Sequence, residues 1–455
     1  MADQMMQYKT DEMAAKQTIP VGYKQTEVGV IPEDWDISII GDIANVKTGP
    51  FGSALHEKDY VHNGTPIITV EHLGEMGITG QNLPMVSDTD RVRLRAYQLD
   101  EGDIVFSRVG SIDRNALVTE GESGWLFSGR LLRVKLKSGC NSPKYISYHF
   151  HSAPFKKRVI EVAVGQTMPS LNTKILNGLL VVLPKTTEEQ TAIAAVLSDT
   201  DSLIVGLEQL IAKKQAIKTA TMQQLLTGRT RLPQFALRPD GTPKGYKTSE
   251  PGQIPEDWTI ETLGGVTEIV RNGSNYSSVA KDGVAVTRIE TIATGFVDVG
   301  RTGVAVRESI HESYRVLRGD ILYSHINSID HIGKVARFDD DIELFHGINL
   351  ILIRTSAVNS LWLFKLLSGE EARKWARQVA KQAVSQASIN TKELKGLLLA
   401  VPSTQEQTAI ATILSDMDSE LTALEQKLAK ARDVKQGMMQ QLLTGRIRLP
   451  LPQEA

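Results

Sequence analysis

Five short segments of this chain occur twice, in the same order and at nearly the same spacing. An internal repeat of this kind constrains the fold more than any local pattern, because two similar sets of segments build two similar units. Two related copies in one chain are expected to be arranged about a pseudo-twofold axis. The matched pairs are Gly22–Lys24 with Gly245–Lys247, Ile31–Trp35 with Ile254–Trp258, Ser170–Lys174 with Ser388–Lys392, Glu189–Ala194 with Glu406–Ala411, and Met222–Arg229 with Met439–Arg446.

The stretches between the matched segments are much less alike. A length of 455 residues is enough for about three ordinary domains, but the repeat predicts two variable blocks and two conserved helices instead. The predicted division is an N-terminal extension at 1–21, a first variable block at 22–185, a first long helix at 186–228, a linker at 229–244, a second variable block at 245–402, a second long helix at 403–445 and a C-terminal tail at 446–455.

A long helix is predicted in each copy, from Thr186 to Thr227 and from Ser403 to Thr444, because neither stretch contains proline. Each ends at Thr-Gly-Arg, where Gly228 and Gly445 suit a left-handed C-terminal cap. Such a helix is about 60 Å long and cannot bury its apolar stripe alone, so the two are expected to form an antiparallel coiled coil within the chain. A coiled coil between two chains is the alternative. The apolar seam of the second copy is Ile410, Leu414, Met417, Leu421, Leu424, Leu428 and Ala431.

Each variable block is predicted to be mixed α/β, so the fold class is α+β: two α/β domains related by a pseudo-twofold repeat and separated by the two long helices. Helices are expected at Pro143–Val164 and Ser360–Val384, and Trp35 and Trp258 are expected to be core anchors. The alternation of Arg91, Arg93 and Arg95 predicts three cations on one strand face. Strands are expected at Thr65–Val70, Asp103–Ser107, Leu131–Leu136, Val284–Ile289, Asp320–Ser324 and Leu350–Arg354.

The composition excludes several classes of protein. Cys140 is the single cysteine, which excludes a disulfide framework and a multi-cysteine metal site and favours a reduced, cytoplasmic protein. No apolar run approaches the ~20 residues needed to cross a bilayer. Lysine and arginine number 51 against 53 aspartate and glutamate, so a nucleic-acid surface would have to be local.

No motif for catalysis is present. The signatures of zinc proteases, serine hydrolases and dinucleotide-binding folds do not occur. The nearest approach to a phosphate loop is Gly295–Thr302, where Arg301 replaces the required lysine, and we interpret it as a chance match. We therefore predict a non-catalytic chain with no cofactor and no metal of its own.

Three duplicated elements connect the chain to a known family. They are the Ile-Pro-Glu-Asp-Trp openings at 31 and 254, the Pro-x-x-x-x-x-Gln-x-x-Ile element from Pro184 with a copy one residue shorter from Pro402, and the Leu-Leu-Thr-Gly-Arg helix ends at 225 and 442. Over nearly its whole length the chain resembles the specificity (S) subunit of type I restriction-modification systems. The resemblance implies that each variable block is a target-recognition domain that reads one half of a bipartite, asymmetric site in double-stranded DNA.

The same resemblance implies the partners. Two methyltransferase (M) subunits, which bind S-adenosylmethionine and methylate adenine N6, are expected to dock on the long helices. Restriction (R) subunits, which need ATP and Mg, would join them to form a nuclease.

Candidate DNA contacts follow from residue type and matched position. Arginine suits guanine, and asparagine or glutamine suits adenine, in the major groove, while lysine and serine typically contact phosphates. Such residues are supplied by two loops after the paired Gly-Asp-Ile strands (Ser107–Asn115 and Ser324–Lys334), by a Gly-rich turn in each block (Lys47–Ser53 and Arg271–Ser277), and by Gln166 before Ser170–Lys174. The candidates are Lys47, Ser53, Arg108, Arg114, Gln166, Arg271, Asn275, Tyr276, His325, Asn327, His331 and Lys334, with Gln386 matching Gln166.

Two other functions fit parts of the pattern. A coiled-coil scaffold that joins proteins without binding DNA would have the same helices, and unconstrained drift would also make the loops diverge. A catalytic protein with an unrecognised site is the second alternative. Binding to duplex DNA that weakens steeply with salt would distinguish the first alternative from a specificity subunit.

Overall fold

A computed structural model describes residues 19–50, 55–74, 77–137, 139, 141–165, 169–250, 252–278, 282–382 and 386–450. Ser53, Cys140 and Gln166 lie outside these ranges, as do most of the predicted N-terminal extension and half of the tail. The chain divides into two compact units, which are 1–208 with 426–455 (unit 1) and 209–425 (unit 2). Each unit contains part of both long helices, whereas the division predicted from sequence treats each helix as a separate segment; that division stays a prediction.

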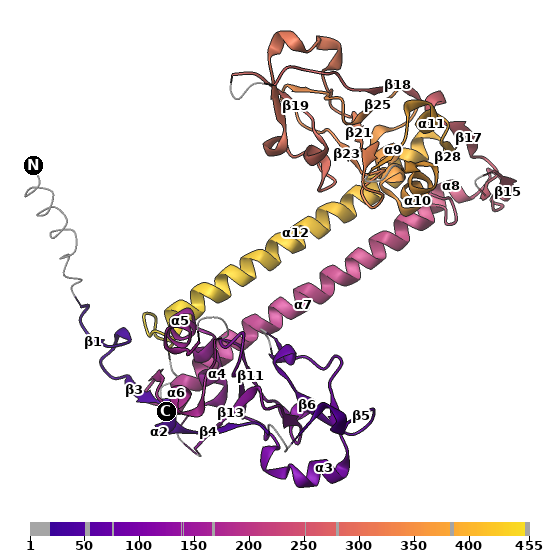
Figure 1. Cartoon of the computed structure of the whole chain (residues 1–455). Coiled ribbons are helices and arrows are strands. Elements are labelled where there is room, and N and C mark those ends of the chain that lie inside the picture. Colours follow the sequence, from indigo (N-terminus) through magenta and orange to yellow (C-terminus); the bar gives the residue numbers. More distant parts are fainter. Residues whose placement is uncertain are drawn as a thin grey trace, which may run out of the picture. The chain divides into compact units, whose positions relative to one another are not determined.

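The long helices are α7 (Thr187–Leu225) and α12 (Thr404–Leu442), each of 39 residues. In unit 1, Lys435 and Arg432 of α12 pair with Asp201 and Glu208 of α7, at 2.5 and 2.6 Å. Residue numbers thus rise along one helix as they fall along the other, so the two run antiparallel in this unit (Figure 1).

In unit 2 the same helices are again antiparallel, because Lys214 and Lys218 pair with Glu420 and Asp418. Buried seam positions include Ile193, Leu197, Ile204, Leu207, Ile410, Leu414, Leu421 and Ala431.

The variable part of unit 1 is built on a four-stranded sheet in the order β11 (Asn115–Leu117), β10 (Ile104–Ser107), β13 (Leu131–Leu136), β4 (Ala44–Thr48). Strand β10 is buried on both faces: Phe106 packs with the helices, and Val105 packs with Phe127 on the other side. This alternation follows from the period of two in a strand. A second sheet has the order β12 (Leu126–Phe127), β6 (Thr65–Ile68), β9 (Met85–Val86), β5 (Tyr60–Val61).

Unit 2 repeats this plan with different side chains. Its main sheet has the order β18 (Thr267–Asn272), β25 (Ile351–Thr355), β21 (Ile321–Tyr323), β23 (Val335–Arg337). Tyr323 packs toward the helices and Leu322 toward the opposite cluster. The second sheet is β20 (Gly303–Ala305), β19 (Val284–Val286), β24 (Leu344–Phe345), and a three-stranded sheet joins β22 (Ile326–Asn327), β27 (Ala387–Ser388) and β26 (Lys381–Gln382).

Each helical stretch expected after the main sheet consists of two helices. In unit 1 they are α4 (Pro143–His151) and α5 (Ala153–Val162), and Ser152 ends the first and caps the second. In unit 2, Gly369 separates α9 (Ser360–Ser368) from α10 (Glu370–Val379). The helices lie against the first turns of α7 and α12 (Figure 1).

Short elements complete both units. Trp35 and Trp258 are 0% and 1% exposed, which confirms them as core residues. Strands β3 (Asp36–Ile39) and β17 (Thr259–Thr262) pair with β14 (Leu180–Leu183) and β28 (Leu398–Val401), just before the long helices. Among the described residues, the other strands and α-helices are the hairpins β1 (Tyr23–Thr26) with β2 (Gly29–Pro32), β15 (Tyr246–Ser249) with β16 (Gly252–Pro255) and β7 (Leu73–Gly74) with β8 (Gly77–Ile78), and the helices α2 (Ile40–Ile43), α3 (Asp88–Arg93), α6 (Thr173–Asn177), α8 (Pro233–Ala236) and α11 (Thr391–Lys395).

The prediction of a strand carrying Arg91, Arg93 and Arg95 is wrong. The first two lie on helix α3, and Arg95 begins a 3₁₀ helix that ends at Tyr97. Ser87 caps α3 by accepting a hydrogen bond from the backbone of Asp90, and this capping residue was the overlooked signal.

Candidate nucleic-acid interface

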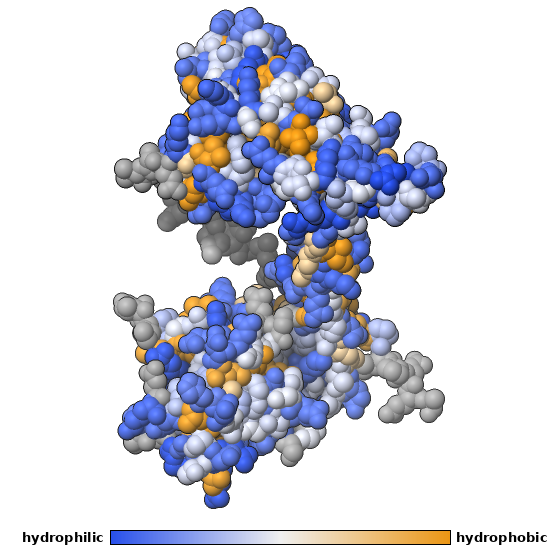
Figure 2. Space-filling view, turned by 90° about the vertical axis from the view of Figure 1, so that its right-hand side faces the viewer, coloured by the Kyte–Doolittle hydropathy of each residue, from blue (hydrophilic) through white to orange (hydrophobic). Residues whose placement is uncertain are grey.

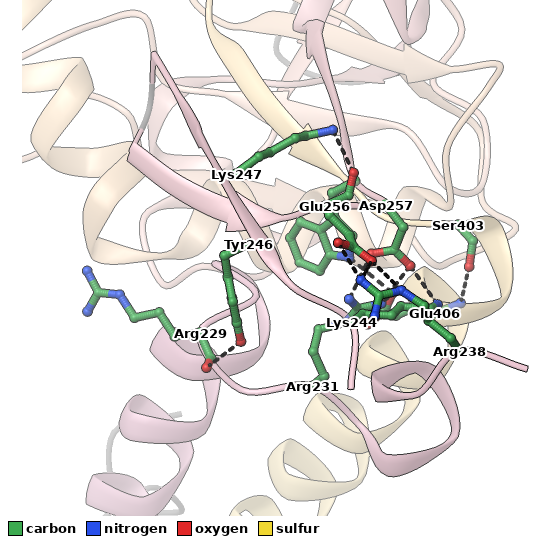
Figure 3. A network of polar contacts seen from close by, with 11 residues as sticks. Arg229, Arg231, Arg238, Lys244, Tyr246, Lys247, Glu256, Asp257, Ser403 and Glu406 are labelled. Atoms are coloured by element: carbon green, nitrogen blue, oxygen red, sulfur yellow. Dashed lines mark hydrogen bonds and ion pairs between the residues drawn. The ribbon is translucent and has the colours of Figure 1, made fainter. Parts of the chain in front are cut away.

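The duplicated motifs of unit 2 meet in one polar network (Figure 3). The Arg231 guanidinium, just after the end of α7, donates to Asp257 at 2.8 Å and to Glu406 at 2.6 Å. It lies 5.8 Å from the Trp258 ring, and the indole N–H of Trp258 donates to Glu406. The Asp-Trp of the opening motif, the start of α12 and the end of α7 are thus held together by one arginine.

Unit 1 contains a corresponding arginine network, although there the buried indole N–H of Trp35 has no hydrogen-bond partner among the residues that the structure describes. Arg448, after the end of α12, donates to Asp34 and Glu189, and its guanidinium is 5.7 Å from the Trp35 ring. In each unit, therefore, the helix end of one sequence copy joins the opening motif and the helix start of the other copy. This junction gives the repeated Ile-Pro-Glu-Asp-Trp and Thr-Gly-Arg segments a structural role.

Gly228 and Gly445 are required by the junction geometry. Their φ angles are +70° and +69°, in the left-handed region that favours glycine. A Cβ on Gly445 would lie 2.4 Å from Cγ of Pro32, and one on Gly228 would lie 2.6 Å from Cγ of Pro255. The helix ends can therefore approach the proline of the opening motif only without a side chain.

The network predicts an acid-sensitive unit 2. Burial opposes ionisation of Asp257, but hydrogen bonds from Arg231 and Lys244 lower its pKa from 3.8 to about 2. A carboxyl with a lowered pKa stabilises the fold above its unfolded pKa and loses that contribution as pH falls through the folded value. We expect the unfolding temperature of unit 2 to fall between pH 4 and pH 2, and to fall less in Asp257→Asn. Thermal unfolding followed by circular dichroism measures this, and the exposed Asp330→Asn is the control; equal profiles for all three proteins would contradict the assignment.

A second polar cluster joins each variable block to both helices. In unit 1, Asp201 of α7 accepts from Lys435 of α12 at 2.5 Å and from the Tyr148 hydroxyl of α4 at 2.7 Å. In unit 2, Asp418 of α12 pairs with Lys218 of α7 and Lys365 of α9. These clusters were not foreseen, although Asp201 and Asp418 occupy matched positions in the repeat.

The two candidate loops are built alike. Each is closed by a backbone hydrogen bond of 2.8 Å, from Ser107 to Arg114 in unit 1 and from Ser324 to Lys334 in unit 2. Each is anchored by one buried isoleucine, Ile112 or Ile332. Both loops are therefore closed at their ends and packed by one core residue, with the closing pair three residues farther apart in unit 2, and their polar residues differ between the units.

The candidate residues of these loops differ in exposure. Arg114 and His331 are exposed, while Arg108 is half-buried and donates to the Gly129 carbonyl at 3.4 Å. His325 is 5% exposed, and burial lowers its pKa to about 4, so it is neutral at physiological pH. Asn327 is half-buried and donates to the Ser324 hydroxyl.

The Ser-x-Asn-Thr-Lys elements lie beside these loops. The backbone N–H of Leu171 donates to the Arg108 carbonyl at 2.8 Å, and that of Ile389 donates to the His325 carbonyl at 2.9 Å. Asn172 and Asn390 cap the helices that follow. In each unit, therefore, a candidate loop meets a repeated element more than fifty residues farther along the chain, and Gln386 is exposed next to β27. Gln166 cannot be placed in the same way, because it lies outside the described residues.

Lys47 and Arg271, the first residues of the two predicted Gly-rich turns, lie on strands β4 and β18 and contact aromatic rings. The Lys47 ammonium lies 4.5 Å from the Tyr97 ring and donates to the carbonyl before it, and the Arg271 guanidinium lies 4.6 Å from the Tyr314 ring and donates to the carbonyl before that residue. Both tyrosines stand five residues before Gly-Asp-Ile, a signal available in the sequence but not used. The two cations are thus already engaged within their units.

The other candidate residues of the Gly-rich turns also differ in exposure. Asn275 is exposed, whereas Tyr276 is half-buried, packs against the cluster around Phe345 and hydrogen-bonds Arg288. Ser53 lies outside the described residues. On the face in Figure 2 the surface is mostly hydrophilic, with hydrophobic residues in small groups, so contacts there would be mainly polar.

Within the ranges described above, no group of three or more His, Cys, Asp or Glu is placed to hold a metal ion. None of the helices in the described part of the chain is both long enough and apolar enough to span a membrane.

Together, the fold and the loops define a duplicated α+β chain with long helices and divergent polar loops. The family model for the type I restriction modification DNA specificity domain matches residues 32–219 and 255–431. The chain therefore belongs to this family.

Relatives and solved structures agree with this assignment. The MjaVIII specificity subunit of Methanocaldococcus jannaschii is 24% identical over 92% of this chain and 94% of its own, and the EcoBI specificity subunit of Escherichia coli is 21% identical over 92% and 87%. An M. jannaschii chain named after the type I enzyme MjaX is 38% identical over 207 residues, so this chain spans about half of that relative (49%). The S subunit from M. genitalium has the same fold, with a TM-score of 0.54 at 14% identity over 90% of this chain and 96% of its own.

Proposed function

We propose that this chain is the DNA-recognition subunit of a type I restriction-modification complex, with 22–185 and 245–402 as two target-recognition domains that each read one half of a bipartite, asymmetric site. One observation carries the proposal. The same closed loop occurs in both units, but it presents Arg114 in one and His331 in the other. A common scaffold with unlike polar side chains is what two different half-sites require.

The long helices are proposed to form one antiparallel coiled coil that sets the spacer between the half-sites and holds the methyltransferase subunits. Their antiparallel ion pairs within each unit support this geometry. Helix α7 also exposes the apolar side chains of Leu203, Val205, Leu210 and Ile217, which we propose as contacts for the methyltransferase subunits.

The proposed partners supply the chemistry. Methyltransferase subunits would use S-adenosylmethionine to methylate adenine N6, and restriction subunits would use ATP and Mg. The base must leave the DNA stack for methylation, and we assign that step to the methyltransferase. This chain would select the DNA sequence at which the complex acts, and it would act in the cytoplasm.

Mapping of methylated adenine across a genome tests the proposal directly. Cells that express the methyltransferase with this chain are expected to carry methylation at one bipartite sequence, and cells without the chain are expected to lack it. Identical maps would favour the rival function, a scaffold that does not bind DNA.

Substitution of the exposed loop residues should separate the two half-sites. We expect Arg114→Ala to relax discrimination at the first half-site by about 1–3 kcal/mol, the usual value of one base contact, and to leave the second half-site unchanged. His331→Ala is expected to do the reverse, so each variant is the control for the other. Methylation of duplexes with single base changes measures both, and equal loss at both half-sites would indicate a folding defect instead.

A further inference from the structure

Unit 2 contains a basic cavity of about 360 Å³ beside the second candidate loop. Its wall comes from the end of α7, the stretch Ala293–Phe296, the start of β23, helices α9 and α10, and α12. Four of its lining residues are basic and one is acidic. They are Lys218, Lys334, Lys365, Arg373 and Asp418.

The positive charge of this cavity is only partly compensated. Asp418 is shared by Lys218 and Lys365, and the Lys365 side chain is only 8% exposed. The Lys334 ammonium donates to a neutral group, the Ala293 carbonyl, at 3.3 Å. Within the described part of the chain the Arg373 side chain has no hydrogen bond or ion pair. Three positive charges therefore remain in excess.

The matched cluster in unit 1 shows that this excess is not needed to hold the fold. There Asp201 is satisfied by Lys435 and by the neutral Tyr148 hydroxyl, which occupies the position of Lys365. In unit 1, one cation and one hydroxyl are therefore sufficient partners for Asp201. In unit 2, Lys365 adds a buried charge that the matched cluster of unit 1 does not need. Desolvating a charge is costly unless a partner compensates it.

We propose that this cavity binds a phosphate group of the DNA backbone next to the half-site read by unit 2, with Arg373 and Lys334 as its contacts. Lysine and arginine are the usual partners of phosphate oxygens. Lys334 closes the loop that carries His331, so the cavity is continuous with the proposed reading surface. The Phe296 ring, 72% exposed, lines the same cavity and offers an apolar contact for a sugar. This inference rests on the proposed function.

The salt dependence of DNA binding tests the phosphate contact. The slope of log K against log salt is negative, and its magnitude falls by about 0.9 for each phosphate contact that is lost. In the complex with its methyltransferase subunits, we expect Arg373→Ala and Lys334→Ala each to reduce the magnitude of that slope, and the double variant to reduce it by about 0.9, on a duplex carrying the mapped target. Base preference at both half-sites should stay the same.

Lys374→Ala is the matched control. It removes the same charge from the next residue of α10, and the Lys374 side chain lines a different cavity. A slope equal to wild type in Arg373→Ala and Lys334→Ala would overturn the inference and leave the proposed function intact. Weaker association of Arg373→Ala with the methyltransferase, at unchanged slope, would overturn it too and assign the cavity to an acidic protein segment. Absence of DNA binding by the wild-type complex would overturn both proposals.

Discussion

Insertion of one heptad into both long helices is expected to lengthen the spacer between the two half-sites by about three base pairs. Seven residues add about 10.5 Å of helix, and DNA rises 3.4 Å per base pair. Seven residues also return the apolar seam to the same face, so the pairs of Lys435 with Asp201 and Lys218 with Asp418 should survive. Insertion after Glu208 and after Glu425 leaves both compact units unaltered. Shorter insertions of one turn, about 5–6 Å, should add one or two base pairs.

Methylation mapping with the wild-type and extended chains measures this directly. A heptad in α7 alone is the control: it leaves α12 too short to run beside its partner, so we expect lower thermal stability and loss of methylation. A changed half-site with an unchanged spacer would disprove the proposed geometry.

The sequence was most informative where the two copies agree. The repeat predicted the bounds of α7 and α12 to within about two residues, and it predicted the burial of both tryptophans. It could do so because the two copies of a matched segment have the same structural role. It did not reveal that Arg231 and Arg448 link one copy to the other. That link depends on where chain segments meet in space, and the arginines lie beyond the motifs they join.

Predictions from local pattern were less accurate. The break at Ser152 was missed although a serine cap followed by proline within the next turn marks a helix start, and the arginine alternation near Arg93 was mistaken for a strand. Candidate contacts chosen by residue type met the same difficulty. Type alone cannot tell Arg114, which is exposed, from His325, which is buried, or from Lys47, which rests on a tyrosine ring. Exposure is set by tertiary packing, and only the loop bounds were visible in the sequence.

Removal of the junction arginine is expected to have the largest effect on stability. The Arg231 side chain is 6% exposed and its partner Glu406 is 2% exposed, so Arg231→Ala would leave a buried carboxylate without its cation. Breaking a buried ion pair in this way costs about 3–5 kcal/mol. For a unit of this size, a loss of about 3 kcal/mol lowers the unfolding temperature by roughly 6–12 °C. Arg231→Lys keeps the charge but not the forked contact with two carboxylates, and an intermediate loss is expected.

Arg229→Ala provides the matched control, because this arginine is exposed and points away from the network in Figure 3. Calorimetry of the three variants should show a shift for the two Arg231 variants and none for Arg229→Ala. Arg448→Ala should cost unit 1 less than Arg231→Ala costs unit 2, because the Arg448 side chain is 39% exposed and water can replace part of its contact. If Arg229→Ala and Arg231→Ala were equally stable, the junction would not hold the repeat together, and the matched motifs would need another explanation, such as contact with a partner subunit.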